Sequence, residues 1–163
     1  MSFRTVAAFG KRQEYRVIAK LLDLGFDVYQ TLVDDQAIDC IVRINPKKYL
    51  DIQIKASSTR SQKVNAGIFV AKDFKPRDNY FFVFYVEYLD KFWVIPSKLF
   101  HKTAGRNVKG KHIGDLTINL TGVKKGEIYP REQYQEYIDN FGLLRKYSRK
   151  TLSRSRFDRL TAS

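Results

Sequence analysis

The stretch YLDIQIKAS, residues 49–57, alternates apolar and polar side chains with the period of a β-strand. Its apolar face consists of Leu50, Ile52, Ile54 and Ala56. Its polar face consists of Tyr49, Asp51, Gln53 and Lys55. A half-buried strand is therefore predicted. A solvated face requires only polarity, so the order Gln-Ile-Lys raises the question of whether this face carries chemistry.

The segments around this strand predict one mixed domain. Residues 8–24 have helical spacing, with an apolar stripe of Val17, Ile18, Leu21 and Leu22, and Gly25 follows where a helix would end. Strand-like runs at residues 26–33, 37–44 and 49–57 are separated by short turn signals, which predicts an antiparallel meander. Further strands are predicted at residues 67–71, 80–89, 91–96 and 115–120, and a second helix at residues 129–144.

Two of these segments carry more detailed expectations. Residues 80–86 are almost continuously apolar, which predicts a strand buried on both faces and central in its sheet. Residues 57–65 are polar and predict an exposed loop, with Val64 as its one candidate core residue. The element order predicts an α+β or mixed α/β domain over residues 1–144, followed by a basic tail at residues 145–163.

The charge of the chain indicates a polyanionic partner. Among 163 residues there are 30 Lys and Arg against 17 Asp and Glu, a formal net charge of +13. Nucleic acid is the expected partner, because basic side chains that neutralise phosphates release condensed counterions. Membrane binding is disfavoured, since the longest apolar run is too short to span a bilayer. The short apolar stretch at the start predicts a cytoplasmic protein, and one cysteine with two histidines argues against disulfides and structural zinc.

Four side chains can be brought to one place by periodicity. Asp39 shares a strand face with Ala37, Ile41 and Arg43, and pairing with the next strand would put it beside Gln53 and Lys55. Glu14 lies within the apolar stripe of the first helix, where an unpaired charge is costly. A divalent cation held with Asp39 would compensate that charge; the alternatives are a salt bridge of Glu14 to Arg43 or Lys20, and a turn-capping role for Asp39.

A hard cation such as Mg²⁺ prefers oxygen ligands. Asp39 can supply a carboxylate, Ile54 its backbone carbonyl and Gln53 a weaker amide oxygen, with Asp51 as a substitute ligand. Lys55 would then contact the scissile phosphate and assist the attacking water.

With Glu14, Asp39 and the motif Gln53-Ile54-Lys55, the chain resembles the PD-(D/E)XK nuclease superfamily over residues 10–57. The resemblance implies a restriction-endonuclease-like fold, a central mixed sheet flanked by helices, and a Mg²⁺ site in which Mn²⁺ can substitute. It assigns Glu14, Asp39, Gln53 and Lys55 as catalytic residues, with metal held by Asp39, Gln53, Ile54 and Glu14. Two positions depart from the family pattern: Ile38 replaces a common Pro, and Gln53 replaces an acid. The Gln-x-Lys variant resembles that of bacterial intron-homing endonucleases.

DNA contacts are expected from the loop after Lys55 and from basic side chains nearby. The candidates are Ser57, Arg60, Lys63, Lys72 and Arg77. The tail carries seven basic residues and one acid, and is as consistent with a solubilising arm as with a DNA contact.

The resemblance implies a Mg²⁺-dependent endonuclease acting on duplex or branched DNA, site-specific in the manner of homing or restriction enzymes. Because two strands must be cut, a homodimer or homotetramer is expected. A Holliday junction resolvase is the nearest alternative, and a noncatalytic nucleic-acid-binding module, with Gln53 having ended the chemistry, is an alternative of another class. An RNA-binding protein is a third, although the aromatic motif of common RNA-binding sheets is absent.

Overall fold

The structure is a computed structural model that describes residues 3–32, 37–60 and 62–146. Its first element, α1 (Phe3–Asp23), confirms the first predicted helix and begins five residues earlier than the periodic pattern does. Val17 and Leu21 are fully buried, but Leu22 is 53% exposed, so the predicted stripe is wrong at that position. Leu22 lies about 100° around the helix from Leu21, which turns it away from the sheet. Gly25 ends the helix with a left-handed φ of 74°, a conformation that glycine adopts without a steric penalty.

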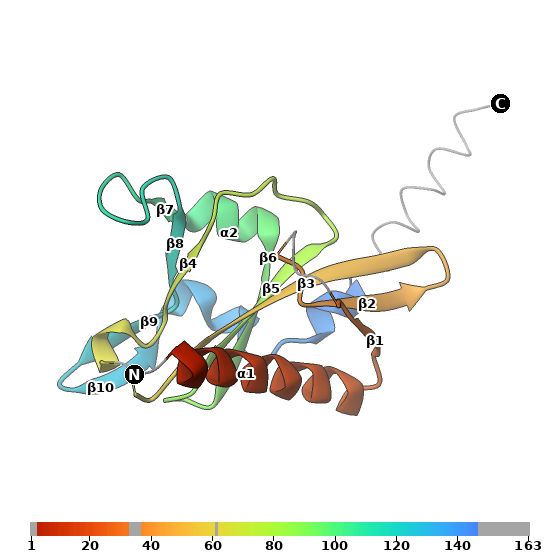
Figure 1. The fold of residues 1–163 in the computed structure, drawn as a ribbon, viewed down its shortest axis with the longest axis horizontal. Helices are drawn as coiled ribbons and strands as arrows, with labels where there is room; N and C mark the ends of the chain where they lie inside the picture. The colour runs from red at the N-terminus through yellow and green to blue at the C-terminus, as the bar shows by residue number, and fades with distance from the viewer. Residues whose placement is uncertain (1–2, 33–36, 61, 147–163) are drawn as a thin grey trace.

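The central sheet has five strands in the order β1-β2-β3-β5-β6 (Figure 1). β1 (Asp27–Gln30), β2 (Cys40–Asn45) and β3 (Lys48–Ser57) form the predicted antiparallel meander. β5 (Tyr80–Val86) pairs with β3 in parallel and with β6 (Lys91–Pro96) antiparallel, which makes the sheet mixed. All seven residues of β5 are buried, as predicted, although β3 rather than β5 is the middle strand.

Each face of the central sheet is covered by a separate hydrophobic core. On one face, α1 packs Val17 and Leu21 against Leu50, Ile52 and other apolar side chains of the sheet. On the other face, aromatic residues of β5 and β6 pack against Phe100 of α2 (Ser97–Thr103) and Ile118 of β8 (Leu116–Asn119). Figure 1 shows α1 running alongside β3, with α2 and β8 on the opposite side. The predicted mixed sheet with flanking helices is therefore the fold of this chain.

Smaller elements complete the second core. β4 (Ile68–Ala71) and β7 (Gly105–Arg106) pair with β8 in a three-stranded sheet, so the predicted strand at residues 67–71 does not join the central sheet. β9 (Thr121–Lys124) and β10 (Glu127–Pro130) form a hairpin. The loop after β3 contains the 3₁₀ turn η1 (Lys63–Asn65), in which Val64 is 59% exposed and so is not a core residue.

The predicted helix over residues 129–144 is wrong. Its start belongs to β10, its middle is the 3₁₀ helix η2 (Glu132–Tyr137), and only residues 142–146 are α-helical within the described chain. Asp139 interrupts the helix with a left-handed φ of 51°. Its N–H donates to the carbonyl of Phe92 at 2.7 Å and its carboxylate accepts the Phe92 N–H at 3.1 Å, so pairing with β6 overrides the helical periodicity.

One irregularity of the sheet positions the candidate site. β2 begins at Cys40, whose partner in β3 is Ile52, whereas β3 continues to Ser57. Beyond Ile52, the edge of β3 that faces β2 therefore has no strand partner in the described part of the chain.

None of the helices in the described ranges combines the length and the apolar character that a membrane-spanning helix needs.

Candidate active site

Asp39 lies at the point where β2 and β3 separate. Its N–H donates to the carbonyl of Ile52 at 2.9 Å, and its carboxylate oxygen Oδ2 accepts the N–H of Ile54 at 2.6 Å. The Thr31 hydroxyl donates to the carbonyl of Ile38 at 2.6 Å and lies 3.1 Å from the carbonyl oxygen of Asp39, which further fixes this segment. The Asp39 side chain thus takes the place of a strand partner for β3, and its negative charge lies against the main chain of the Gln-Ile-Lys motif.

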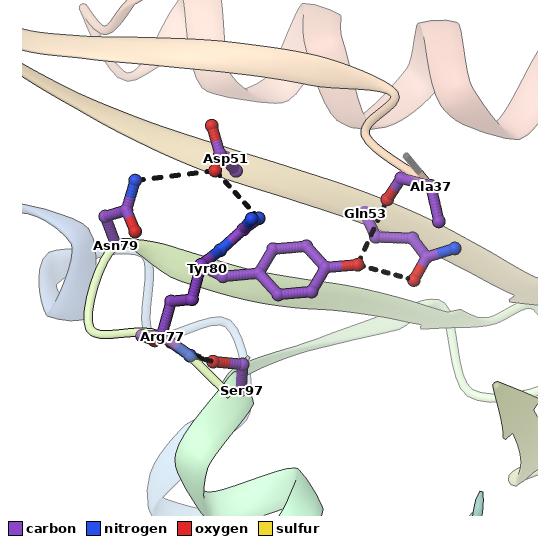
Figure 2. A network of polar contacts seen from close by, with 7 residues as sticks. All are labelled: Ala37, Asp51, Gln53, Arg77, Asn79, Tyr80 and Ser97. Carbon is purple, nitrogen blue, oxygen red and sulfur yellow. Dashed lines mark hydrogen bonds and ion pairs between the residues drawn. The ribbon is translucent and has the colours of Figure 1, made fainter. Parts of the chain in front are cut away.

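Gln53 contacts Tyr80, which comes from the first position of β5 (Figure 2). The Tyr80 hydroxyl lies 2.9 Å from Gln53 Oε1 and 3.1 Å from the carbonyl oxygen of Ala37, two residues before Asp39. A phenol therefore joins the β3 motif to the segment that carries Asp39. The guanidinium of Arg77 lies 4.8 Å from the centre of the Tyr80 ring and covers one of its faces.

Glu14 is half-buried, with 21% of its side chain exposed, and forms an ion pair with Lys11 at 2.5 Å. The sequence suggests Arg43 or Lys20 as a salt-bridge partner of Glu14, but the ion pair is formed with Lys11. Arg43 lies instead 3.8 Å from Asp27. The pKa of Lys11 is raised, chiefly by the hydrogen bond from Lys11 to Glu14, and the charge of Asp39 also contributes. Glu14 and Asp39 therefore act on the same region of α1.

Cys40 gives a second sign of this proximity. Burial, followed by the charges of Asp39 and Glu14, raises the pKa of its thiol to about 12. Both carboxylates thus lie within electrostatic range of one buried sulfur at the start of β2. The high pKa keeps the thiol protonated, which makes Cys40 a core residue and not a nucleophile.

Lys55 lies two residues beyond Gln53 on the same face of β3 and opposite Phe84 in β5. Ile54, between them, points its side chain into the core against α1. In a strand, the N–H and C=O of one residue point toward the same neighbour, so the carbonyl of Ile54 faces the open edge at which Asp39 binds its N–H. The motif thus presents an amide, a carbonyl and an ammonium group around one strand end.

The chemistry of these donors fits a hard divalent cation. The described residues hold no cluster of three or more His, Cys, Asp and Glu side chains suited to a metal. Mg²⁺ needs less, because it keeps several waters and binds through one or two carboxylates together with substrate phosphates. Asp39 and the Ile54 carbonyl are oxygen donors of this kind, and Glu14 adds negative charge. The amide oxygen of Gln53 is a donor of the same kind, but here it accepts the Tyr80 hydroxyl.

Asp51 has a different role from the substitute ligand expected from the sequence. Its carboxylate accepts a hydrogen bond from Arg77 Nη2 at 2.9 Å and one from Asn79 Nδ2 at 3.4 Å (Figure 2). Burial raises the pKa of Asp51, and the charge of Arg77 opposes that rise. Asp51 therefore holds Arg77 in place beneath Tyr80, and its charge is already compensated.

The five predicted DNA-contacting residues lie in unlike environments. Arg60, Lys63 and Lys72 are exposed, and Lys63 also donates a hydrogen bond to the carbonyl of Gly126 at 3.1 Å. Ser57 is buried and its hydroxyl donates to the carbonyl of Ala66, so it stabilises the turn after β3. Arg77 is bound to Asp51. The segment 147–163 of the predicted basic tail lies outside the described residues.

A cleft of about 350 Å³ lies beside Arg60. It is lined by residues of α1 and of the loop after β3, namely Thr5, Ala8, Phe9, Arg12 and Arg60. Arg12 lies 5.7 Å from the centre of the Phe9 ring. Two guanidinium groups and an aromatic ring therefore meet at the end of β3 that follows Lys55.

Sequence reasoning missed Tyr80 and Lys11. The sequence places Tyr80 at the start of an apolar strand, where it reads as an ordinary core residue, and its contact with Gln53 depends on parallel pairing between β3 and β5. Lys11 carried a usable signal, because it precedes Glu14 by three residues and such pairs meet on a helix surface.

Comparisons with known proteins agree with this architecture. Neither a protein-family model nor a curated protein matches the sequence. Among solved structures, the chain is similar to the bacterial homing endonuclease I-Ssp6803I, with a TM-score of 0.60 and 22% identity over 86% of this chain and 93% of that one. It also matches Hjc, a Holliday junction resolvase from Archaeoglobus fulgidus, with a TM-score of 0.44 and 13% identity over 68% of this chain and 83% of that one. The first likeness shows that the chain has the fold of that homing endonuclease.

Proposed function

We propose that this protein is a metal-dependent endonuclease that hydrolyses phosphodiester bonds of duplex DNA at specific sites, in the manner of a homing or restriction enzyme. The observation that carries the proposal is the 2.6 Å hydrogen bond from the Ile54 N–H to the Asp39 carboxylate. This bond places an acid against the Gln53-Ile54-Lys55 motif at an open strand edge. The fold shared with a homing endonuclease and the formal charge of +13 support the same conclusion.

Each residue of the site has a role in this proposal. Asp39, the carbonyl of Ile54 and the amide oxygen of Gln53 would hold Mg²⁺ or Mn²⁺, and Glu14 would complete the negative charge around it. When bound, the cation would polarise the scissile phosphate as a Lewis acid. The ammonium group of Lys55 would offset the charge that develops on the phosphate and orient the attacking water.

The bound DNA would extend past Lys55 toward the loop after β3. Arg60 and Arg12 converge there on one cleft, and exposed Lys63 and Lys72 lie in the segments that follow β3 and β4. Contacts of this type are to phosphates, so they position the duplex and make binding depend on salt. We leave Ser57 out of the interface, because it is buried and its hydroxyl is engaged with Ala66.

Cutting both strands of a duplex needs two such sites. A homodimer or homotetramer would supply them by symmetry. This part of the proposal is tested by the molar mass of the purified protein in solution, with and without a DNA target.

Cleavage assays test the proposed activity directly. Supercoiled plasmid, a synthetic four-way junction and linear genomic DNA are each incubated with the protein in Mg²⁺, in Mn²⁺ and in EDTA. Lys55→Ala is compared with Lys48→Ala, which truncates a half-buried lysine at the opposite end of the same strand. We expect metal-dependent cutting of duplex DNA that is lost in Lys55→Ala and kept in Lys48→Ala.

The other outcomes separate the remaining candidates. Preferential cutting of the four-way junction would assign the protein as a resolvase. Salt-sensitive DNA binding that is indifferent to Mg²⁺ and to Lys55, with no cleavage in a library of DNA targets, would overturn the nuclease proposal in favour of a noncatalytic binding module.

A further inference from the structure

The contact between Tyr80 and Gln53 raises a question of hydrogen-bond polarity. The Tyr80 hydroxyl has one proton and lies within hydrogen-bond distance of two oxygens, Gln53 Oε1 at 2.9 Å and the carbonyl oxygen of Ala37 at 3.1 Å. A single proton can make only one good bond of this kind. The orientation of the Gln53 amide decides which oxygen receives it.

In the observed orientation, Gln53 Oε1 accepts the phenol proton, and the nitrogen end of the amide points away from Tyr80 (Figure 2). An NH₂ group is a hydrogen-bond donor and cannot ligate a cation. With this orientation, Gln53 therefore adds no ligand to a site formed with Asp39.

Rotation of the amide about its last torsion exchanges its oxygen and its nitrogen while the shape of the side chain is preserved. The Gln53 NH₂ then donates to the phenol oxygen, and the phenol donates to the Ala37 carbonyl. All three groups are satisfied in this arrangement, and Gln53 Oε1 points away from Tyr80. The Ala37 carbonyl can only accept, so in the rotated state the phenol proton has a defined acceptor.

We propose that Tyr80 is a positioning residue that, by donating its proton to Ala37, holds the Gln53 amide with its oxygen turned toward a divalent cation. This inference rests on the proposed function in one respect, because it requires a cation at Asp39 and Gln53. It explains how a neutral amide can replace a family acid, since a carboxylate has two equivalent oxygens and has no wrong orientation. Arg77, bound to Asp51 and stacked on the Tyr80 ring, keeps the phenol in place.

The test is a cycle of four proteins: the unsubstituted chain, Tyr80→Phe, Gln53→Glu and the double variant. Mn²⁺ binding to each is titrated by electron paramagnetic resonance in the absence of DNA, so that the readout does not depend on cleavage. We expect Tyr80→Phe to weaken Mn²⁺ binding by about 10-fold, as the loss of a group that orients a ligand does. In the Gln53→Glu background, the same substitution should weaken binding less than about twofold, because both oxygens of Glu are alike.

A matched control removes a different phenol. Tyr88→Phe deletes a hydroxyl that donates to the carbonyl of Thr59 at 2.6 Å, away from Gln53, and should leave Mn²⁺ binding unchanged. Melting temperatures of all variants show whether each is folded. The side-chain ¹⁵NH₂ signals of Gln53 supply a second readout, and Mg²⁺ should shift them in the unsubstituted chain more than in Tyr80→Phe.

Equal loss of Mn²⁺ affinity from Tyr80→Phe in both backgrounds would show a purely structural role and overturn the inference. Mn²⁺ binding that is unaffected by Tyr80→Phe would overturn it as well, while the proposed function would stand. If the unsubstituted chain bound no Mn²⁺ even with uncleaved DNA present, the proposed function itself would fail together with the inference.

Discussion

Asp39 and Asp51 are carboxylates on the same face of the β2–β3 hairpin, yet their surroundings differ. Asp51 lies opposite Ile41, where β2 still pairs with β3, and its charge is compensated by Arg77 at 2.9 Å. Asp39 lies where β2 has ended, and its carboxylate accepts the main-chain N–H of Ile54. The end of β2, and not the acid itself, therefore makes this edge of β3 available to a ligand.

The largest effect is expected from removing the charge of each acid in turn. Asp39→Asn keeps an oxygen that can accept the Ile54 N–H but removes a cation ligand, so we expect metal-dependent cleavage to fall by more than about 100-fold. Asp51→Asn should reduce cleavage by less than about 10-fold, because Asp51 acts only through Arg77 and Tyr80. Single-turnover rates on one duplex target measure both. A larger loss in Asp51→Asn than in Asp39→Asn would reverse the assignment of the two acids.

A smaller effect is expected on stability when Arg77 is removed. Arg77→Met leaves the partly buried carboxylate of Asp51 without its cation and should lower the free energy of unfolding by about 1–3 kcal/mol at neutral pH. Burial raises the pKa of Asp51, and loss of Arg77 raises it further. The folded state then binds more protons than the unfolded state, so the stability deficit should grow as pH rises from about 4 to about 7.

Urea unfolding at several pH values checks this expectation, with Arg43→Met as the control. Arg43 lies 3.8 Å from Asp27, whose side chain is 55% exposed. A surface pair of this kind contributes little to stability, so Arg43→Met should be less destabilising than Arg77→Met. A deficit for Arg77→Met that is the same at every pH would mean that Asp51 does not depend on Arg77 for its charge.

The smallest effect is expected on DNA binding by the cleft beside Arg60, which lies past the end of β3. Replacing both Arg12 and Arg60 by Ala removes the two guanidinium groups of the cleft, so duplex binding in EDTA should weaken by about 10-fold. The slope of log K against log salt concentration should decrease by about 2, because two phosphate contacts are lost. Fluorescence anisotropy at several salt concentrations measures both quantities.

A control with the same loss of charge separates contact from net charge. Arg106 and Lys98 are each paired with an aspartate, at 2.9 Å and 2.7 Å, and lie outside the cleft. Replacing both by Ala should change the salt slope by less than about 1. Equal slopes for the two double variants would show that the cleft makes no direct phosphate contact.

Much of the central sheet was predictable because its signals are local. Turn signals between the strand-like runs predicted the meander of β1, β2 and β3, and the continuous apolar run of β5 predicted that both of its faces are buried. The 3.6-residue period of α1 predicted Val17 and Leu21 in the core and failed at Leu22, one position beyond the buried face. At residues 129–144 the same period failed because pairing of Asp139 with Phe92 in β6 was not visible locally.

The chemical groups of the candidate site and their order along the chain could be predicted from the sequence: an acid in a helix, an acid before a strand, and Gln53 and Lys55 two residues apart. Strand alternation also determined that Asp51, Gln53 and Lys55 share a face. The tertiary structure was needed to show that Asp51 is compensated by Arg77 and that Tyr80 contacts Gln53. These contacts depend on where β2 ends and on the parallel pairing of β3 with β5, because pairing between distant segments is set by the packing of the whole domain and not by the residues of one strand.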